Sequence, residues 1–346
     1  MASDSTKQVD LVCLGELLID FVATATGPLR SAPGFVRAAG GAPANVAVAA
    51  ARLGLKTAFL GAVGRDEFGQ FLRATLESNG VDVSGLVHPP RGRTPLAFVS
   101  LKENADRDFL FYWHETADHC MGVADLHLGL VRSCRVFHFG SISLIHPSMR
   151  AVTQAALAAA RDTGEVFITC DPNVRLNLWH SSVEARGTIL GILTWAHLVK
   201  LNEEELEFLT GKADLKRGLQ ALAQFTKAAV LVTQGPRGAA YCWGNVEGEA
   251  PGFSVAAVDS TGAGDGFMAG FLCRMLETQG ELRQLQPDAQ TLREWVLYAN
   301  AVGALATTKR GAIPAFPTPS EAAALLQGTS HLGLSEPSRG GDTKAG

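Results

Sequence analysis

The stretch Asp259–Phe267, DSTGAGDGF, combines acidic, hydroxyl and glycine residues directly before an apolar run. Gly262 and Gly264 allow a tight turn that brings backbone N–H groups close to a ligand. At a helix N-terminus such groups form an anion site, for which phosphate is the natural occupant. Asp265 would then stand beside that anion as a base. The polar residues could equally well only cap the helix, so this stretch alone leaves both interpretations open.

A second glycine-rich turn precedes a helix much earlier in the chain, in GGAPANVAVAAARLG. Gly40 and Gly41 form the turn, Pro43 suits a first helical position, and Gly54 suits a left-handed cap. Two such turns favour a ligand role over capping. No GxxxxGK[ST] pattern occurs, which excludes the P-loop route to nucleotide binding.

The elements that position these turns alternate between strands and helices. The apolar run 9–23 predicts two strands with a turn near Gly15, and the later pattern predicts a mostly parallel sheet covered on both faces. FSVAAV is expected to be a strand before DSTGAGDGF, and 291–311 a final long helix. Residues 94–115 break the alternation and predict an antiparallel hairpin, typical of a lid. The sequence predicts one α/β domain with a small β lid.

Composition limits the classes of partner. The 346 residues include 47% hydrophobic and 18% charged residues, with a net charge of −4 and no basic run, so nucleic acid is not an expected partner. No apolar stretch reaches the roughly 20 residues of a membrane span, and the start lacks the pattern of a secretory signal. The six cysteines are scattered, which favours reduced thiols in a cytoplasmic protein.

The two glycine-rich stretches, in this order, resemble the signatures of the ribokinase-like (PfkB) carbohydrate kinases over residues 9–326. DSTGAGDGF matches the D-T-x-G-A-G-D-x-F signature with Ser260 in place of Thr. The resemblance implies a ribokinase-like three-layer α/β/α sandwich over residues 9–327, with lid segments near 22–39 and 94–115. Residues 1–8 are expected to be flexible and 328–346 a disordered tail.

The same resemblance implies an ATP-dependent sugar kinase with Asp265 as general base. The N–H groups of Gly262, Ala263 and Gly264 would form the anion hole for the transferred phosphoryl group.

Cofactor roles also follow from the family. Asn202 and Glu205, in LNEEELEFLTG, would help to order Mg²⁺ and phosphates, although the same spacing is that of a capping box. The remaining positions are expected near ATP or near a K⁺ ion. On the ATP side they are Thr233, Gln234, Gly235, Gly238 and Asn300, and on the K⁺ side Asp259, Thr261, Ala306, Lys309 and Gly311.

Asp20 is a carboxylate within an apolar strand, which is costly unless a ligand or a local cap satisfies it. The family pattern favours a sugar there. DPNVRLNLW and the lid sequence are similar to those of fructokinases, which implies D-fructose as substrate. One departure is Trp113, where many relatives have Arg. The other residues implied at the sugar are Gly40, Gly41, Asn45, Arg107, Phe111, Asp171 and Arg175.

Other functions stay open at this point. A 2-keto-3-deoxygluconate kinase or another ketose kinase is the nearest alternative, and a catalytically silent sugar-sensing module is an alternative of a different class. Relatives that dimerise through the lid make a homodimer compatible with the resemblance.

Overall fold

The computed structural model describes residues 9–101 and 107–330. In these ranges the chain forms a large sheet of nine strands and a small sheet of four. The large sheet has the order β13 (Val246–Pro251), β12 (Gly238–Trp243), β11 (Ala229–Thr233), β10 (Leu198–Asn202), β9 (Phe167–Cys170), β8 (Cys134–Phe139), β1 (Val9–Leu14), β4 (Thr57–Ala62) and β5 (Val81–Val87). The seven strands from β11 through β5 in this order pair in parallel with one another. β12 and β13 are added at one edge in antiparallel orientation.

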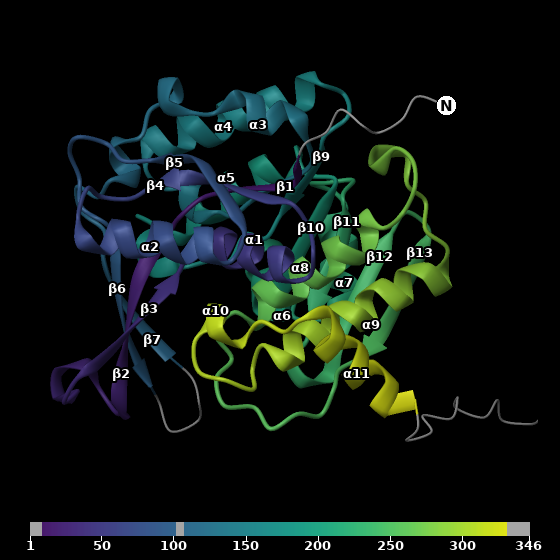
Figure 1. Cartoon of the computed structure of the whole chain (residues 1–346). Coiled ribbons are helices and arrows are strands. Elements are labelled where there is room, and N and C mark those ends of the chain that lie inside the picture. Colours follow the sequence, from purple (N-terminus) through teal and green to yellow (C-terminus); the bar gives the residue numbers. More distant parts are fainter. Residues whose placement is uncertain (1–8, 102–106, 331–346) are drawn as a thin grey trace, which may run out of the picture.

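Helices cover both faces of the large sheet (Figure 1). One face carries α1 (Ala42–Arg52), α2 (Glu67–Ser78), α8 (Ala263–Leu276), α9 (Ala289–Leu305), α10 (Ala312–Ala315) and α11 (Pro319–Ser330). The other face carries α3 (Leu128–Ser133), α4 (Pro147–Asp162), α5 (Ser182–Leu193), α6 (Glu203–Thr210) and α7 (Leu215–Leu222).

Strand β1 shows why the central strands are apolar throughout. Leu11 and Cys13 belong to the core under one helical layer, and Val12 and Leu14 to the core under the other. A parallel strand buried on both faces has no solvent side on which to place polar residues. The predicted three-layer α/β/α architecture is therefore confirmed.

The small sheet has the order β3 (Phe35–Gly40), β2 (Leu18–Thr26), β6 (Leu96–Leu101) and β7 (Arg107–Tyr112). β2 follows β1 after a turn at Gly15, as predicted, and β6 pairs with β7 as the predicted antiparallel hairpin. Figure 1 shows this sheet projecting to one side of the main body, below α2. It is the β lid.

Two sequence expectations were wrong. FSVAAV (253–258) forms no strand; it is irregular and largely exposed, because it has no neighbouring strand with which to pair. The helix expected over 291–311 ends at Leu305 and is not the last one, since α10 and α11 follow it. α11 ends at Ser330, slightly beyond the expected boundary at 327. The expectations for 1–8 and for 331–346 lie outside the described residues.

None of the helices in the described ranges has the length and apolar character needed to cross a membrane.

Candidate active site

A cavity of about 990 Å³ opens at the carboxyl ends of β9, β10 and β11, below the lid. In parallel α/β sheets this edge is where ligands bind. Of the predicted site residues, the following line the cavity: Asp20, Gly41, Asn45, Phe111, Arg175, Asn202, Thr233, Gln234, Gly235, Thr261, Gly262, Gly264 and Asp265. The fold thus gathers residues from both ends of the chain around one space.

The turn before α8 requires glycine. Gly262 has a φ of 80°, a left-handed conformation that side chains rarely adopt, and a Cβ there would lie 2.6 Å from the Cβ of Ala312. The turn places Asp265 in the first helical turn, where the residue is 7% exposed. Of the three predicted anion-hole residues, Gly262 and Gly264 line the cavity. The Ala263 N–H instead donates to the Ser260 carbonyl at 3.2 Å.

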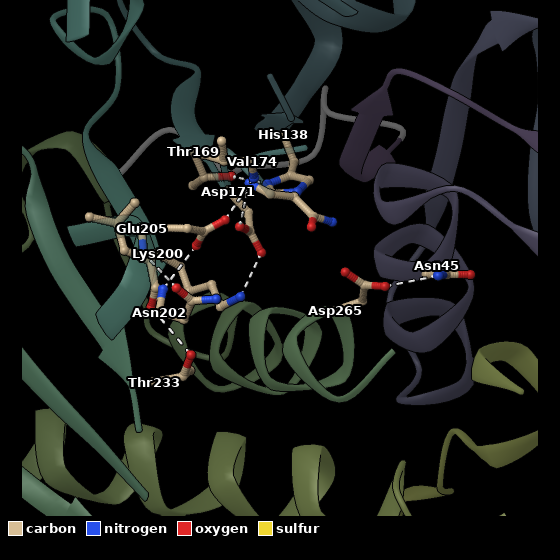
Figure 2. Close-up of polar contacts among 12 residues, drawn as sticks. Asn45, His138, Thr169, Asp171, Val174, Lys200, Asn202, Glu205, Thr233 and Asp265 are labelled. Carbon is tan, nitrogen blue, oxygen red and sulfur yellow. Dashed lines mark hydrogen bonds and ion pairs between the residues drawn. The ribbon is translucent and has the colours of Figure 1, made fainter. Parts of the chain in front are cut away.

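Asp265 is electrostatically unusual. Its Oδ2 accepts a hydrogen bond of 2.8 Å from Asn45 Nδ2 on α1 (Figure 2). Burial, together with the nearby charge of Asp171, raises the pKa of Asp265 to about 6, against the opposing effects of Asn45, Lys200 and Arg175. A carboxylate with a pKa near neutrality is suited to accept a proton in a reaction at physiological pH.

A buried ion pair stands across the cavity from Asp265 (Figure 2). Lys200 Nζ lies 2.9 Å from Asp171 Oδ2, and both side chains are almost fully buried. Burial alone would lower the pKa of Lys200, but the charges of Asp171 and Glu205 outweigh it and raise that pKa. A Cβ added to Gly264 would lie 2.6 Å from Lys200 Nζ. A fixed cation therefore stands beside the glycine turn of α8.

Asn202 and Glu205 form the capping box that the sequence left as an alternative. Asn202 Oδ1 accepts from Glu205 N at 2.7 Å, and Glu205 Oε2 accepts from Asn202 N at 2.9 Å. Glu205 Oε1 accepts from Val174 N at 2.7 Å, which ties the loop after β9 to α6. Asn202 lines the cavity, whereas Glu205 stands behind it and orders its wall.

On the lid side, β2 places Asp20 at the cavity in a half-buried position. A Cβ at Gly40 would lie 2.2 Å from Asp20 Oδ2, so the glycine makes room for this carboxylate. Gly41 has a φ of 110° and caps the N-terminus of α1. Phe111 comes from β7. Arg107 begins the same strand, but its side chain lies outside the described residues.

Trp113, the departure from the family pattern, does not line the cavity. Its Nε1 donates to Asp118 Oδ2 at 2.6 Å, and its ring packs at 5.5 Å from that of Phe111. The residue therefore supports the lid strand beside Phe111.

Two residues expected near ATP do not line the cavity. Asn300 Nδ2 donates to the carbonyls of Ala250 and Pro251, at 3.1 and 3.0 Å, and so fastens the end of β13 to α9. A Cβ on Gly238 would lie 2.1 Å from the Ala250 carbonyl oxygen, which explains this glycine by close backbone approach.

The residues expected at a monovalent cation do come together. Asp259 accepts from the N–H of Thr261 with one oxygen and from that of Gly311 with the other, both at 2.8 Å. The carbonyl of Thr307 accepts from Val258 and Asp259. Thr261 Oγ1 is buried without a hydrogen-bond partner among the described residues. Ala306 is buried at the end of α9, and the Lys309 side chain is exposed.

Lys200 and Glu16 are among the cavity residues that the sequence reasoning missed. Lys200 lies in the apolar strand HLVKLN, and Glu16 lies in the apolar run GELLID. The reasoning applied to Asp20, that a charge within an apolar strand needs a partner, would have found both. Glu16 Oε1 accepts from Ala42 N at 2.8 Å, and burial raises the Glu16 pKa to about 7.

Comparison with known proteins agrees with this geometry. The pfkB family carbohydrate kinase profile matches residues 8–319. The chain is 44% identical to probable fructokinase-4 of Arabidopsis thaliana over 331 residues, which are 95% of this chain and 100% of that protein. It is 44% identical to fructokinase-2 of Solanum lycopersicum over 320 residues, 92% and 96% of the two chains.

Comparison with solved structures also finds similarity to fructokinases. Fructokinase from Xylella fastidiosa with bound ATP matches with a TM-score of 0.84 and 34% identity, over 93% of this chain and 99% of that one. Fructokinase from Vibrio cholerae O395 with fructose, ADP and calcium bound matches with a TM-score of 0.83 and 35% identity, over 92% and 99%. This chain belongs to the pfkB family of carbohydrate kinases.

Proposed function

We propose that the protein transfers the γ-phosphate of ATP to D-fructose and forms fructose 6-phosphate. The family membership supports sugar phosphorylation, and relatives at 44% identity over nearly their whole length bear the name fructokinase. A solved relative holds fructose and ADP together. The cavity of this chain offers a carboxylate for sugar hydroxyls at Asp20 and a base at Asp265, on one continuous surface.

The observation that carries the catalytic part is the burial of Asp265 against Asn45. We assign Asp265 as the base that takes the proton of the attacking sugar hydroxyl. The Asn45 hydrogen bond at 2.8 Å fixes the carboxylate through Oδ2. Oδ1 is then the oxygen left for the hydroxyl, and a pKa of about 6 leaves it mostly ionised at pH 7.

The transferred phosphoryl group would lie between the turn of α8 and Lys200. The N–H groups of Gly262 and Gly264 and the ammonium of Lys200 supply positive charge at one place. Electrostatic stabilisation of this kind is the main contribution of a protein to phosphoryl transfer. Asp171 holds Lys200 in position through their 2.9 Å contact.

ATP would occupy the side of the cavity formed by Thr233, Gln234 and Gly235. Mg²⁺ bound with the nucleotide would neutralise part of the phosphate charge. Asn202 is the residue of its motif that reaches the cavity, and Glu205 keeps that Asn in place through the capping box.

A K⁺ ion fits the junction of the 258–261 and 307–311 segments. The unpartnered, buried Thr261 Oγ1 and the carboxylate of Asp259 are hard oxygen donors of the type that such cations prefer. The same carboxylate ties Gly311 to the α8 turn, so a cation there would stabilise the anion hole.

A homodimer through the lid is the assembly that we propose. The lid exposes apolar side chains that a second copy would cover: Phe35, Val36, Leu110 and Tyr112. Sedimentation of the wild type beside Val36→Asp would test this, and a monomeric wild type would refute it. We place the protein in the cytoplasm, a reducing compartment compatible with its six free cysteines.

The test of the function is a coupled ADP-release assay with Mg-ATP and K⁺. Fructose, glucose, ribose, tagatose, adenosine and 2-keto-3-deoxygluconate would be compared, with Asp265→Asn alongside. We expect saturable turnover with fructose and a loss of about 10²- to 10⁴-fold in the variant, with unchanged circular dichroism. A preference for another sugar would refute the fructose assignment. Retention of more than about a tenth of the activity would refute the assigned base.

A further inference from the structure

A second cavity, of about 480 Å³, lies at the opposite edge of the large sheet. It is bordered by the amino-terminal ends of β9, β10 and β11, at Phe167, His197 and Ala229, and by the far end of β12 at Trp243. Figure 1 shows these strands side by side. The carboxyl ends of β9, β10 and β11 open into the catalytic cavity, so the two cavities are separated by one strand length. For the five residues of β10 this is about 16 Å.

The charge of this second cavity is entirely positive. Arg161 reaches it from the end of α4, Lys227 from the turn before β11, and Arg283 from the 3-10 helix 282–284. No Asp or Glu is among its lining residues, all of which lie in the described part of the chain. None of the three cations forms an ion pair with a described residue. All three residues are exposed, and together they form a patch of positive charge that attracts anions.

Two of these cations are held in place before any ligand arrives. Arg283 Nη1 donates to the carbonyl of Gly164 at 2.6 Å. The Arg161 guanidinium lies 5.0 Å from the centre of the Trp195 ring, a cation–π contact. Side chains that are already ordered lose less entropy when they bind. The rim of the cavity is therefore preorganised.

The pKa of His197 reflects the positive charge around the cavity. Its Nδ1 accepts a hydrogen bond of 2.8 Å from the Ile168 N–H, so the ring is a neutral acceptor at this atom. Burial first, and then the charges of Arg283 and Arg161, lower the pKa of His197 to about 4. The same field that disfavours a further proton would favour a bound anion.

The rest of the lining combines aromatic, aliphatic and uncharged polar residues. Trp195, Phe225 and Trp243 face this space, and Phe225 is 41% exposed although it is large and apolar. The volume is within the range of small-molecule sites. We propose that this cavity is a second, non-catalytic nucleotide site, in which the three cations hold the phosphates and the aromatic rings contact the base.

The test is isothermal titration calorimetry of the full chain with Mg-ADP, at low and at high salt. We expect two sites in the wild type, the second weakened by salt because it depends on partly exposed charges. The double variant Lys227→Gln/Arg283→Gln should bind one equivalent of ADP, and its kcat and KM for fructose should be unchanged. Arg132→Gln/Lys212→Gln removes the same charge elsewhere on the surface and should keep two sites. Lys227→Gln alone should weaken the second site by about tenfold.

The outcomes separate this proposal from the proposed catalytic function. If the wild type binds one equivalent of ADP and the double variant Lys227→Gln/Arg283→Gln also binds one, the second site is overturned and the catalytic site is unaffected. If the wild type binds one equivalent of ADP and the double variant binds none, the second site is supported, and the result counts against nucleotide binding at the catalytic cavity. Inorganic phosphate and fructose 6-phosphate should compete poorly with ADP. Equal competition would overturn the assignment of a nucleotide.

Discussion

Replacing Asn45 with Ala should shift the pH dependence of catalysis without moving the base. Asn45 Nδ2 donates to Asp265 Oδ2 at 2.8 Å in a buried position. A hydrogen bond to an ionised group contributes about 1.5–3 kcal/mol, and 1.4 kcal/mol corresponds to about one pKa unit. Because this bond stabilises the charged form, its loss should raise the pKa of Asp265 by about one to two units, from about 6 to about 7 or 8.

The expected change in kcat follows from the fraction of Asp265 that is ionised. At pH 7 a carboxyl of pKa 6 is about nine-tenths ionised, and one of pKa 7 to 8 is about a half to a tenth ionised. We therefore expect kcat of Asn45→Ala to fall about two- to tenfold at pH 7 and to recover near pH 9. The assay is kcat at saturating fructose and ATP from pH 5 to pH 9.5, so that any loss of sugar affinity does not enter.

The matched control is Asn300→Ala. Asn300 is equally buried, but its amide serves the carbonyls at the end of β13. The acid side of the kcat–pH profile of Asn300→Ala should coincide with that of the wild type. If Asn45→Ala loses activity by the same factor at every pH, the reasoning that Asn45 sets the pKa of the base is refuted.

Glu16→Gln should reduce the pH dependence of stability. Burial raises the pKa of folded Glu16 to about 7, above its ordinary value of 4.5, so the ionisation of this group costs the wild type about 3 kcal/mol of unfolding free energy as pH rises from about 4.5 to about 7. Urea unfolding at pH 5 and at pH 8 should therefore show a change in stability that is less favourable in the wild type than in the variant by about 2 to 3 kcal/mol, because the remaining groups titrate in both proteins. Gly264→Ala directs a methyl group at Lys200 Nζ and should lower kcat about 100-fold, whereas Gly187→Ala, where a Cβ meets open space, should leave kcat unchanged; equal kcat in the two would contradict the phosphoryl position. Replacing K⁺ with tetramethylammonium should lower the activity of the wild type but not that of Thr261→Val, and equal sensitivity would count against the cation site.

Local chemistry accounts for the parts of the fold that the sequence predicted. The glycine turns before α1 and α8 were recognisable because Gly41 and Gly262 adopt positive φ values that other residues avoid. The lid hairpin was recognisable from its two β-rich runs. FSVAAV shows the limit, since its β-branched residues favour a strand but no partner strand is available.

The site was predictable as a set of motifs but not as a network. Nothing in the local sequence pairs Asn45 with Asp265, which are 220 positions apart. Asn300 illustrates the reverse: family position suggested a ligand, and the structure gives its amide a backbone role. Lys200 was overlooked because a single charge inside an apolar strand was not weighed there as it was at Asp20.

The separation of Asn45 from Asp265 also has a consequence for the timing of protein synthesis. Ribosomes add about 5–20 residues per second, so about 10 to 45 s pass between the appearance of these two residues. During that interval a nascent chain can already have formed β1, β2 and α1, with Asp20 in place, but it has no base. An incomplete chain could therefore encounter sugar but could not consume ATP, and phosphorylation would begin only when translation has nearly finished.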